Sequence, residues 1–262
     1  MTTDVSIYMT TTIRSQDNLD MLNYALEYAR VHYPKEPIIV ISDGSDPKIL
    51  TPVMIKQLSD RFNVDIKVVN SRSKLSKSGE LLRLYYYLHA NKPTTWALCL
   101  HDSQLINSRF VIPNNEPYQF LFSAAHRYNA PIDELNIITR MNEPSLVKLY
   151  LNRDNWFMGF GAQCVVKHEF LKEVDKRYPS FFKAFLHSIN TRTDRMCCER
   201  ITGVVFHSLY RSRRTMFGDI FEYAMRLPNG EWGYSLRQFK SDLTNNSQSL
   251  KALPTIKIWV GR

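Results

Sequence analysis

The fold is decided by residues 5–42, which read VSIYMTTTIRSQDNLDMLNYALEYARVHYPKEPIIVIS. The first nine of these residues are rich in β-branched and aromatic side chains and contain no Gly or Pro, which is typical of a buried strand. Apolar residues then recur at helical spacing over residues 18–33, and Pro34 ends the pattern. The short apolar run at residues 38–42 predicts a parallel strand. Strand, helix and strand in this order form a βαβ unit.

The same alternation continues as far as residue 107. The patterns predict helices over 51–62 and 78–90 and strands over 65–70 and 95–101. We therefore expect an α/β fold with a mostly parallel central sheet flanked by helices, whose ligand lies beyond the carboxyl ends of the strands. Residues 1–107 are interpreted as the nucleotide-binding half.

The second half of the chain is less regular. Its patterns predict helices over 117–128, 168–177, 179–188 and 194–210, and strands over 136–141 and 146–151. No repeat or low-complexity linker separates the halves, so we expect one domain over residues 1–262, with 108–262 as the acceptor-binding and catalytic half.

Composition limits the classes of partner. The chain has 262 residues, 44% of them hydrophobic, and a formal charge of +9, so we expect a globular protein that attracts nucleotides, other polyanions or anionic membrane. Its four cysteines show no CxxC spacing, which favours a reducing compartment. We find no signal peptide and no apolar run long enough for a spanning helix, and we expect a cytoplasmic protein with at most peripheral membrane contact.

Polar groups follow four of the predicted strands, where open α/β sheets hold their ligands. These groups are residues 10–14 (TTTIR), 43–45 (DGS), Arg72 and residues 101–103 (HDS). No GxGxxG follows the first strand, and no GxxxxGK[ST] is present. The sequence therefore predicts a ligand site at the strand ends without indicating a dinucleotide.

Three segments resemble the inverting GT-A glycosyltransferases, particularly those that build bacterial and viral surface polysaccharides. VSIYMTTTIRSQDNL is similar to their first strand and donor loop, IIVISDGSD to their second strand, and WALCLHDSQL to the strand that carries their acidic metal-binding motif. The resemblance covers most of the chain and is most specific in the first hundred residues. It implies a GT-A fold, a nucleotide-sugar donor with UDP as the expected nucleotide, a hydroxyl of a glycan or glycolipid as acceptor, and no nucleic acid partner.

For the donor, the resemblance implies that Thr10, Thr12 and Arg14 line the nucleotide and that Asp43 accepts a hydrogen bond from the base. A carboxylate suits that role because a uracil imide offers a single donor. Asp43 as a residue that only shapes its turn is the alternative. Arg83 is expected either to reach the base or a phosphate or to be a solvated helix residue.

The metal motif departs from the family pattern. A DxD motif supplies two carboxylates to a hard cation, whereas this chain supplies Asp102 after His101. Asp102 is expected in the donor site, where it holds the ribose or shares a Mn²⁺ or Mg²⁺ with His101. A metal-independent reaction needs another positive charge beside the leaving diphosphate, and Lys257 and Arg262 are the candidates.

An inverting transfer needs a base for the acceptor hydroxyl. The resemblance places this base early in the helix over 194–210, which contains Asp194 and Glu199. These two side chains point about 140° apart around the helix axis, so only one of them can face the site. We choose Glu199, with Asp194 second and a structural ion pair between Glu199 and Arg200 as the alternative. The residues expected to form the floor under the acceptor sugar are Trp156, Gly159, Phe160 and Gly161, with core packing as the alternative for Phe160.

Two other functions remain open. A sugar-phosphate nucleotidylyltransferase also uses a parallel sheet, but that class normally begins with a Gly-rich loop where this chain has TTTIR. The positive charge alone is compatible with a nucleic-acid-binding protein, although no recognised motif supports it.

Overall fold

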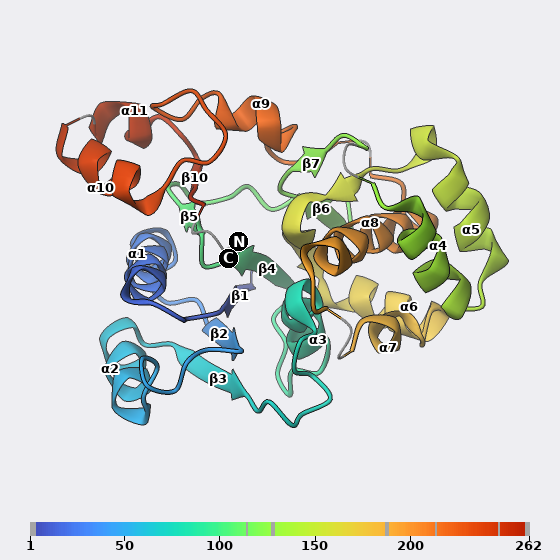
Figure 1. The fold of residues 1–262 in the computed structure, drawn as a ribbon, viewed down its shortest axis with the longest axis horizontal. Helices are drawn as coiled ribbons and strands as arrows, with labels where there is room; N and C mark the ends of the chain where they lie inside the picture. Colours follow the sequence, from blue (N-terminus) through green and yellow to red (C-terminus); the bar gives the residue numbers. More distant parts are fainter. Residues whose placement is uncertain are drawn as a thin grey trace.

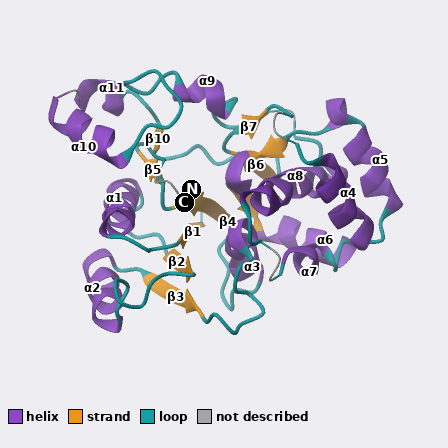
Figure 2. Ribbon diagram, in the orientation of Figure 1, coloured by secondary structure: helices purple, strands orange, loops and turns teal. Residues whose placement is uncertain are grey.

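Six strands form the central sheet of the computed structural model, which describes residues 4–113, 115–126, 129–186, 189–212, 214–245 and 247–259 (Figures 1 and 2). The order across the sheet is β3-β2-β1-β4-β9-β6. The strands are β1 (Val5–Thr11), β2 (Ile38–Asp43), β3 (Asp65–Val69), β4 (Trp96–His101), β6 (Tyr118–Phe120) and β9 (Cys164–Lys167). The first four run parallel, and β9 runs antiparallel to both of its neighbours. The α/β class with a mostly parallel sheet is therefore confirmed, and strands from both halves of the chain build it.

Helices flank this sheet on both sides. In Figure 1, α1 (Gln16–His32) and α2 (Pro52–Phe62) lie to the left of the strands, whereas α3 (Leu82–Leu88), α6 (His168–Arg177) and α8 (Arg192–Leu209) lie to the right. Polar caps precede α1 and α2: Ser15 accepts a hydrogen bond from the N–H of Asn18, and Thr51 accepts one from the N–H of Met54. Because helices cover both faces, β1 and β4 are buried almost throughout.

Two predicted strands, 136–141 and 146–151, are wrong. These residues belong to helices α4 (Pro131–Arg140) and α5 (Pro144–Leu151). Each helix begins with a proline, whose missing N–H is harmless in the first turn, and each buries residues four positions apart. Short apolar runs do not distinguish a helix from a strand without such flanking signals.

The predicted helix over 117–128 is also wrong. Residues 118–120 form β6, and Ser123–Ala124 form β7, which pairs with β8 (Met158–Gly159). The run YQFLF at 118–122 is aromatic and buried, so it packs as the sheet's last strand beside β9 rather than as one face of a helix. Residues 127 and 128 lie outside the described part of the chain.

The C-terminal segment returns to the first half of the chain. After α7 (Phe181–Phe185) and α8 come α9 (Ile220–Ala224), α10 (Leu236–Asn245), α11 (Ser247–Lys251) and β10 (Thr255–Lys257). In Figure 1, α10 and α11 lie beside α1, and Lys240 forms a 2.6 Å ion pair with Asp20 of that helix. β10 pairs antiparallel with β5 (Gln104–Ile106), which directly follows β4. Residues near 257 therefore lie beside the end of β4.

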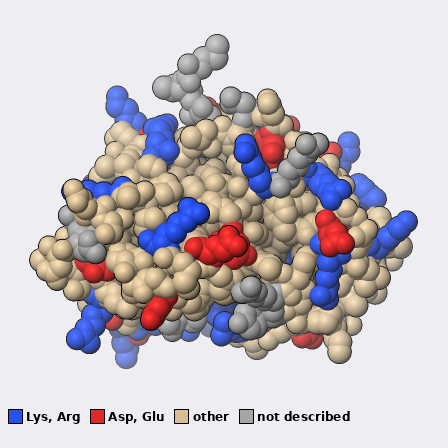
Figure 3. All heavy atoms as spheres, turned by 90° about the horizontal axis from the view of Figure 1, so that it is seen from above, with Lys and Arg blue, Asp and Glu red and all other residues tan. Residues whose placement is uncertain are grey.

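The surface agrees with the spread of basic residues along the sequence. Figure 3 shows Lys and Arg side chains at several separate places on one face, with Asp and Glu between them. Within the part of the chain that the structure describes, no helix combines the length and the apolar character needed to cross a membrane.

Candidate active site

The carboxyl ends of β1, β2 and β4 meet at one edge of the sheet. Thr10 pairs with His101 in the register of β1 and β4, and the N–H of Asp102 donates to the carbonyl of Thr10 at 3.1 Å. The hydroxyl of Thr12 donates to the carbonyl of Asp43 at 2.9 Å, which ties β1 to β2. The structure thus brings together these five residues, which were chosen from separate parts of the sequence.

Asp43 and Arg14 lie at the open side of this edge. The Asp43 carboxylate is half-buried, and its Oδ2 accepts the backbone N–H of Lys77 at 2.9 Å. Burial raises the pKa of Asp43, against the opposing effect of that hydrogen bond. Arg14 is exposed, and its Nε donates to the carbonyl of Gly44 at 3.2 Å. A carboxylate acceptor and a cation therefore lie within two neighbouring loops.

Arg83 is enclosed by protein rather than solvated, since its exposed fraction is 0%. Its Nη1 donates to the Thr10 hydroxyl at 2.7 Å and to the Leu100 carbonyl at 3.3 Å, and its Nη2 donates to the Gly161 carbonyl. Arg83 therefore joins β1 and β4 to η3, a 3₁₀ turn at Phe160–Ala162. Its predicted contact with a nucleotide stays a prediction.

Glu80 is a buried carboxylate that the sequence reasoning missed. It lies in η1 (Gly79–Leu81), contacts Nε2 of His101, and forms a 3.4 Å ion pair with Arg83. Burial opposes its ionisation, but His101 and Arg83 together hold the pKa of its carboxyl well below its usual range. The one available signal was its position three residues before Arg83, the spacing of neighbours on one helix face.

The side chains described here do not fit a divalent cation shared by His101 and Asp102. Asp102 is 1% exposed and accepts the Thr11 hydroxyl at 2.5 Å, whereas the His101 ring is engaged by Glu80. Across the described residues, no group of three or more His, Cys, Asp and Glu side chains is arranged to hold a metal ion.

A lysine from the C-terminal segment lies at the same edge. β10 carries Lys257, whose Nζ donates to the Ser103 hydroxyl at 2.6 Å, just after the end of β4. Lys257 also contributes to lowering the pKa of His101, after the larger effect of burial. Its predicted place near the donor strands is therefore consistent with the fold, while Arg262 lies outside the described residues.

Gly161 is the point where the two halves of the site meet. It adopts φ 62°, and a Cβ placed on it would lie 2.6 Å from Cε1 of His101. Its carbonyl accepts from Arg83, and its N–H lies near enough to the carboxylate of Glu199 on α8 to lower the pKa of that group. The close approach predicted for this glycine is thus made by the His101 ring.

Glu199 is partly exposed and lies beside Gly161 and the Glu80 carboxylate. Burial, followed by repulsion from Glu80, raises the pKa of Glu199 to about 8. Arg200, Arg195 and the Gly161 N–H oppose this shift. The carboxyl therefore exchanges its proton near neutral pH, as a general base requires.

Asp194 caps the beginning of α8. It is the third residue of the capping box of α8, and its Oδ2 accepts the N–H groups of Thr191 at 2.8 Å and Asn190 at 2.9 Å. These hydrogen bonds lower its pKa in spite of burial. Its carboxylate is thus bound to the start of the helix.

Arg200 pairs with Glu134 of α4, with Nε and Oε1 3.3 Å apart. Both residues are buried, and Glu134 also accepts the Tyr150 hydroxyl at 2.6 Å and the Ala130 N–H at 2.8 Å. The Arg200 Nε donates to Asn129 at 2.5 Å. Buried charges thus fasten α8 to α4 and α5 directly after Glu199.

The four residues predicted to form the acceptor floor lie in different surroundings in the structure. Trp156 is 3% exposed, and its Nε1 donates to the Tyr150 carbonyl at 3.1 Å. Gly159 packs directly on the Phe120 ring, which leaves no room for a Cβ. Phe160 is partly exposed beside Gly161. Of the four, Gly161 contacts Arg83 and lies near Glu199, and Phe160 directly precedes it.

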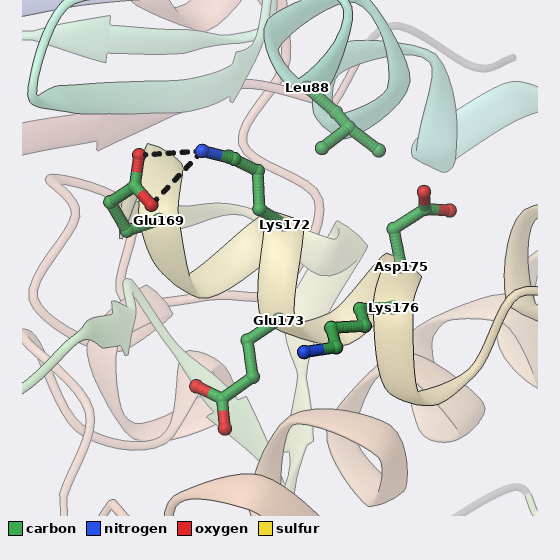
Figure 4. Close-up of a pocket in the computed structure, with 6 residues that line it drawn as sticks. All are labelled: Leu88, Glu169, Lys172, Glu173, Asp175 and Lys176. Atoms are coloured by element: carbon green, nitrogen blue, oxygen red, sulfur yellow. Dashed lines mark hydrogen bonds and ion pairs between the residues drawn. The ribbon is translucent and has the colours of Figure 1, made fainter.

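An open hollow elsewhere contains none of the candidate residues. It has a volume of about 620 Å³ and is lined by Leu88 and five residues of α6 (Figure 4). Lys172 and Glu169 form an ion pair of 3.1 Å across its rim. We therefore restrict the candidate site to the strand ends and α8.

No protein-family model matches this chain, and no curated protein matches its sequence. Among solved structures, the chain is similar to core-mannan synthase A of Aspergillus fumigatus in a Mn/GDP form, with 10% identity, a TM-score of 0.48, and coverage of 78% of this chain and 70% of that one. It is also similar to the glycosyltransferase GlyE of Streptococcus pneumoniae, with 10% identity, a TM-score of 0.44, and coverage of 98% and 55%. TarS of S. aureus in complex with UDP matches with 13% identity, a TM-score of 0.39, and coverage of 70% and 55%. At such low similarity, the function of this chain has to be inferred from its own residues.

Proposed function

We propose that this chain is a glycosyltransferase that moves a sugar from a nucleoside diphosphate sugar to a hydroxyl of a glycan or lipid-linked acceptor, with inversion. The observation that carries the proposal is the link through Gly161. Its N–H lies near enough to the carboxylate of Glu199 to lower the pKa of that group, and its carbonyl accepts from Arg83, which in turn binds Thr10 at the end of β1. A base is thereby set beside the strand edge at which α/β folds bind nucleotides.

On the donor side, Asp43 accepts the imide N–H of a uracil base, and Thr10 and Thr12 lie beside the ribose and diphosphate. Asp102 is enclosed by protein and accepts the Thr11 hydroxyl, so it supports this edge of the sheet. Arg14 supplies an exposed positive charge at the same edge, and Lys257 adds a buried one. These cations stabilise the negative charge that develops on the leaving diphosphate. UDP is the nucleotide that we expect.

In the transfer step, the acceptor oxygen attacks the anomeric carbon as the bond from that carbon to the diphosphate breaks. The bonding electrons leave with the nucleoside diphosphate, and Glu199 takes the proton of the acceptor hydroxyl. With a pKa of about 8, Glu199 is a strong enough base to receive this proton. We expect the rate of transfer to rise with pH up to about 8, since the carboxyl must be deprotonated first.

The test compares Glu199→Gln with the wild type in a thermal-shift screen of nucleoside diphosphates and in transfer assays with UDP-sugars. UDP should raise the Tm of both proteins, while transfer by the variant falls by about 10²- to 10⁴-fold and loses its rise toward pH 8. Glu173→Gln, an exposed glutamate on α6, is the matched control and should behave as the wild type.

Other results would redirect the proposal. Full turnover by Glu199→Gln would move the base elsewhere, and a UDP shift that survives Asp43→Ala would remove Asp43 from the base site. Pyrophosphate release from a nucleoside triphosphate and a sugar phosphate would indicate a nucleotidylyltransferase instead.

A further inference from the structure

Four aromatic rings from distant segments gather beside the candidate site. Trp232 stacks on Phe221 with ring centroids 4.5 Å apart, lies 4.4 Å from the Trp259 ring, and lies 6.0 Å from Phe160. Phe160 belongs to η3, Phe221 to α9, and Trp232 and Trp259 to loops. We call these four residues the aromatic platform.

Trp232 is the ring that this platform presents to solvent. Its exposed fraction is 40%, whereas Trp96 and Trp156 are 5% and 3% exposed. Exposing a large aromatic surface is unfavourable in water, so a fold that keeps such a surface open commonly uses it for binding.

The backbone around Trp232 forms a turn with hydrogen bonds on either side. Gly230 and Gly233 adopt φ of 61° and 99°, which a side chain would disfavour, and they shape the turn on either side of Trp232. The Gly230 N–H donates to the Leu227 carbonyl at 2.8 Å, and the Trp259 N–H donates to the Tyr234 carbonyl at 2.8 Å. This backbone places the Trp232 indole against the rings of Phe221 and Trp259.

The platform is continuous with both sides of the candidate site. Phe160 directly precedes Gly161, which lies near enough to Glu199 to lower the pKa of its carboxyl. Trp259 lies two residues after Lys257, and the Lys257 Nζ is 5.8 Å from the Trp259 ring. Two rings that contact Trp232 thus connect the platform to Gly161 on one side and to the lysine of the donor edge on the other.

We propose that the aromatic platform binds the glycan acceptor by stacking a pyranose ring of that acceptor against Trp232. This inference rests on the proposed function, since the acceptor is the substrate whose hydroxyl Glu199 deprotonates. The C–H face of a pyranose is apolar and packs on an aromatic ring, while its hydroxyls point sideways to water or to polar groups.

A lipid surface suits this region less well. Of the large apolar side chains that are strongly exposed among the described residues, only Met225 and Trp232 fall within residues 216–235, and the others belong to distant segments. Binding in a membrane interface uses a broad apolar face flanked by basic residues. The exposed apolar area of Met225 and Trp232 is closer in size to one or two sugar rings than to a membrane-binding face.

The experiment compares Trp232→Leu with Trp232→Tyr. Leucine keeps apolar bulk but has no ring, whereas tyrosine keeps a ring for stacking. Binding is measured on an array of defined pyranose oligosaccharides with UDP present, and the best binder is then used as acceptor in transfer assays. We expect Trp232→Leu to weaken binding and raise the acceptor KM by about tenfold, and Trp232→Tyr to stay within about threefold of the wild type.

Each outcome decides between explanations. Val111→Ala, an exposed apolar residue on another segment, is the surface control, and the UDP-induced Tm shift checks that each variant keeps a folded donor site. Equal oligosaccharide binding by Trp232→Leu and the wild type would overturn the proposal that the platform binds the acceptor. The proposal would also be overturned if the protein bound no oligosaccharide but sedimented with phosphatidylcholine/phosphatidylglycerol vesicles in a way that depended on Trp232. Oligosaccharide binding that depends on Trp232 in a protein that does not bind UDP would support the platform and refute the proposed transfer.

Discussion

The two sides of the candidate site are built by different forces. On the donor side, Thr12 and Asp43 are held by hydrogen bonds between hydroxyl, carboxylate and backbone groups at the ends of neighbouring strands. On the side of the base, buried ion pairs hold α8 and the residues around Gly161: Glu134 with Arg200, and Glu80 with Arg83. The difference predicts that changes on the two sides have effects of unequal size.

The expected size of each effect depends on what happens to the remaining group when its partner is removed. A neutral hydrogen bond at a partly exposed loop is replaced by a bond to water. A buried charge that loses its partner has no such replacement and becomes strongly unfavourable. The position of Glu199 should therefore tolerate few changes in its neighbours, while the donor loops should tolerate more.

The largest effect is expected for Arg200→Met. This change leaves the Glu134 carboxylate buried without its cation and should lower the free energy of unfolding by about 3–5 kcal/mol in urea titrations. The double variant Arg200→Met/Glu134→Leu should recover most of the loss, since neither charge remains. Arg61→Met, in an exposed pair with Glu27, is the control, and it should cost no more than about 1 kcal/mol. Similar losses for Arg200→Met and Arg61→Met would erase the distinction between the two sides.

An intermediate effect is expected for Gly161→Ala. The added Cβ would meet the His101 ring at 2.6 Å. Gly230→Ala is a matched control because Gly230 has nearly the same φ, 61° against 62°, and its nearest atom lies 3.9 Å from such a Cβ. Both variants carry the strain of a positive φ, so Gly161→Ala should be less stable than Gly230→Ala by the overlap alone, about 1–3 kcal/mol in thermal or urea unfolding. Equal losses of unfolding free energy in the two variants would mean that the His101 ring shifts away from the added Cβ at no cost.

The smallest effect is expected for Thr12→Val on the donor side. The change removes the hydroxyl that donates to the Asp43 carbonyl at 2.9 Å and should cost about 0.5–1.5 kcal/mol of unfolding free energy. Thr244→Val, at an exposed position of α10, controls for the loss of a hydroxyl and should leave the midpoint of unfolding unchanged. A loss as large as that of Arg200→Met would show that the donor loops are no more tolerant than α8.

Sequence patterns predicted the first half of the fold because its signals are local. The helix over 51–62 and the strands near residues 5, 38, 65 and 96 were found from periodicity and breakers alone. Residues 136–141 and 146–151 were assigned to strands because their short apolar runs were not weighed against Pro131 and Pro144. Helices α10 and α11 were not predicted from the sequence.

The candidate site was predictable only in part. Strand ends pointed to Thr10, Asp43 and Asp102, because parallel strands bring their carboxyl ends to one edge. Glu80 and Trp232 carried no comparable signal, since their neighbours lie far away in the sequence: His101 for the first, Phe160 and Trp259 for the second.

The sequence by itself determined the alternation of strands and helices in the first half and the polar residues that end those strands, since both depend on neighbours a few positions apart. Only the tertiary structure decided that Glu199 contacts Gly161, that Arg200 pairs with Glu134, and that β10 carries Lys257 to Ser103. These contacts join residues separated by up to 154 positions. They form because burying each charge requires a partner, and the packed fold alone brings that partner within reach.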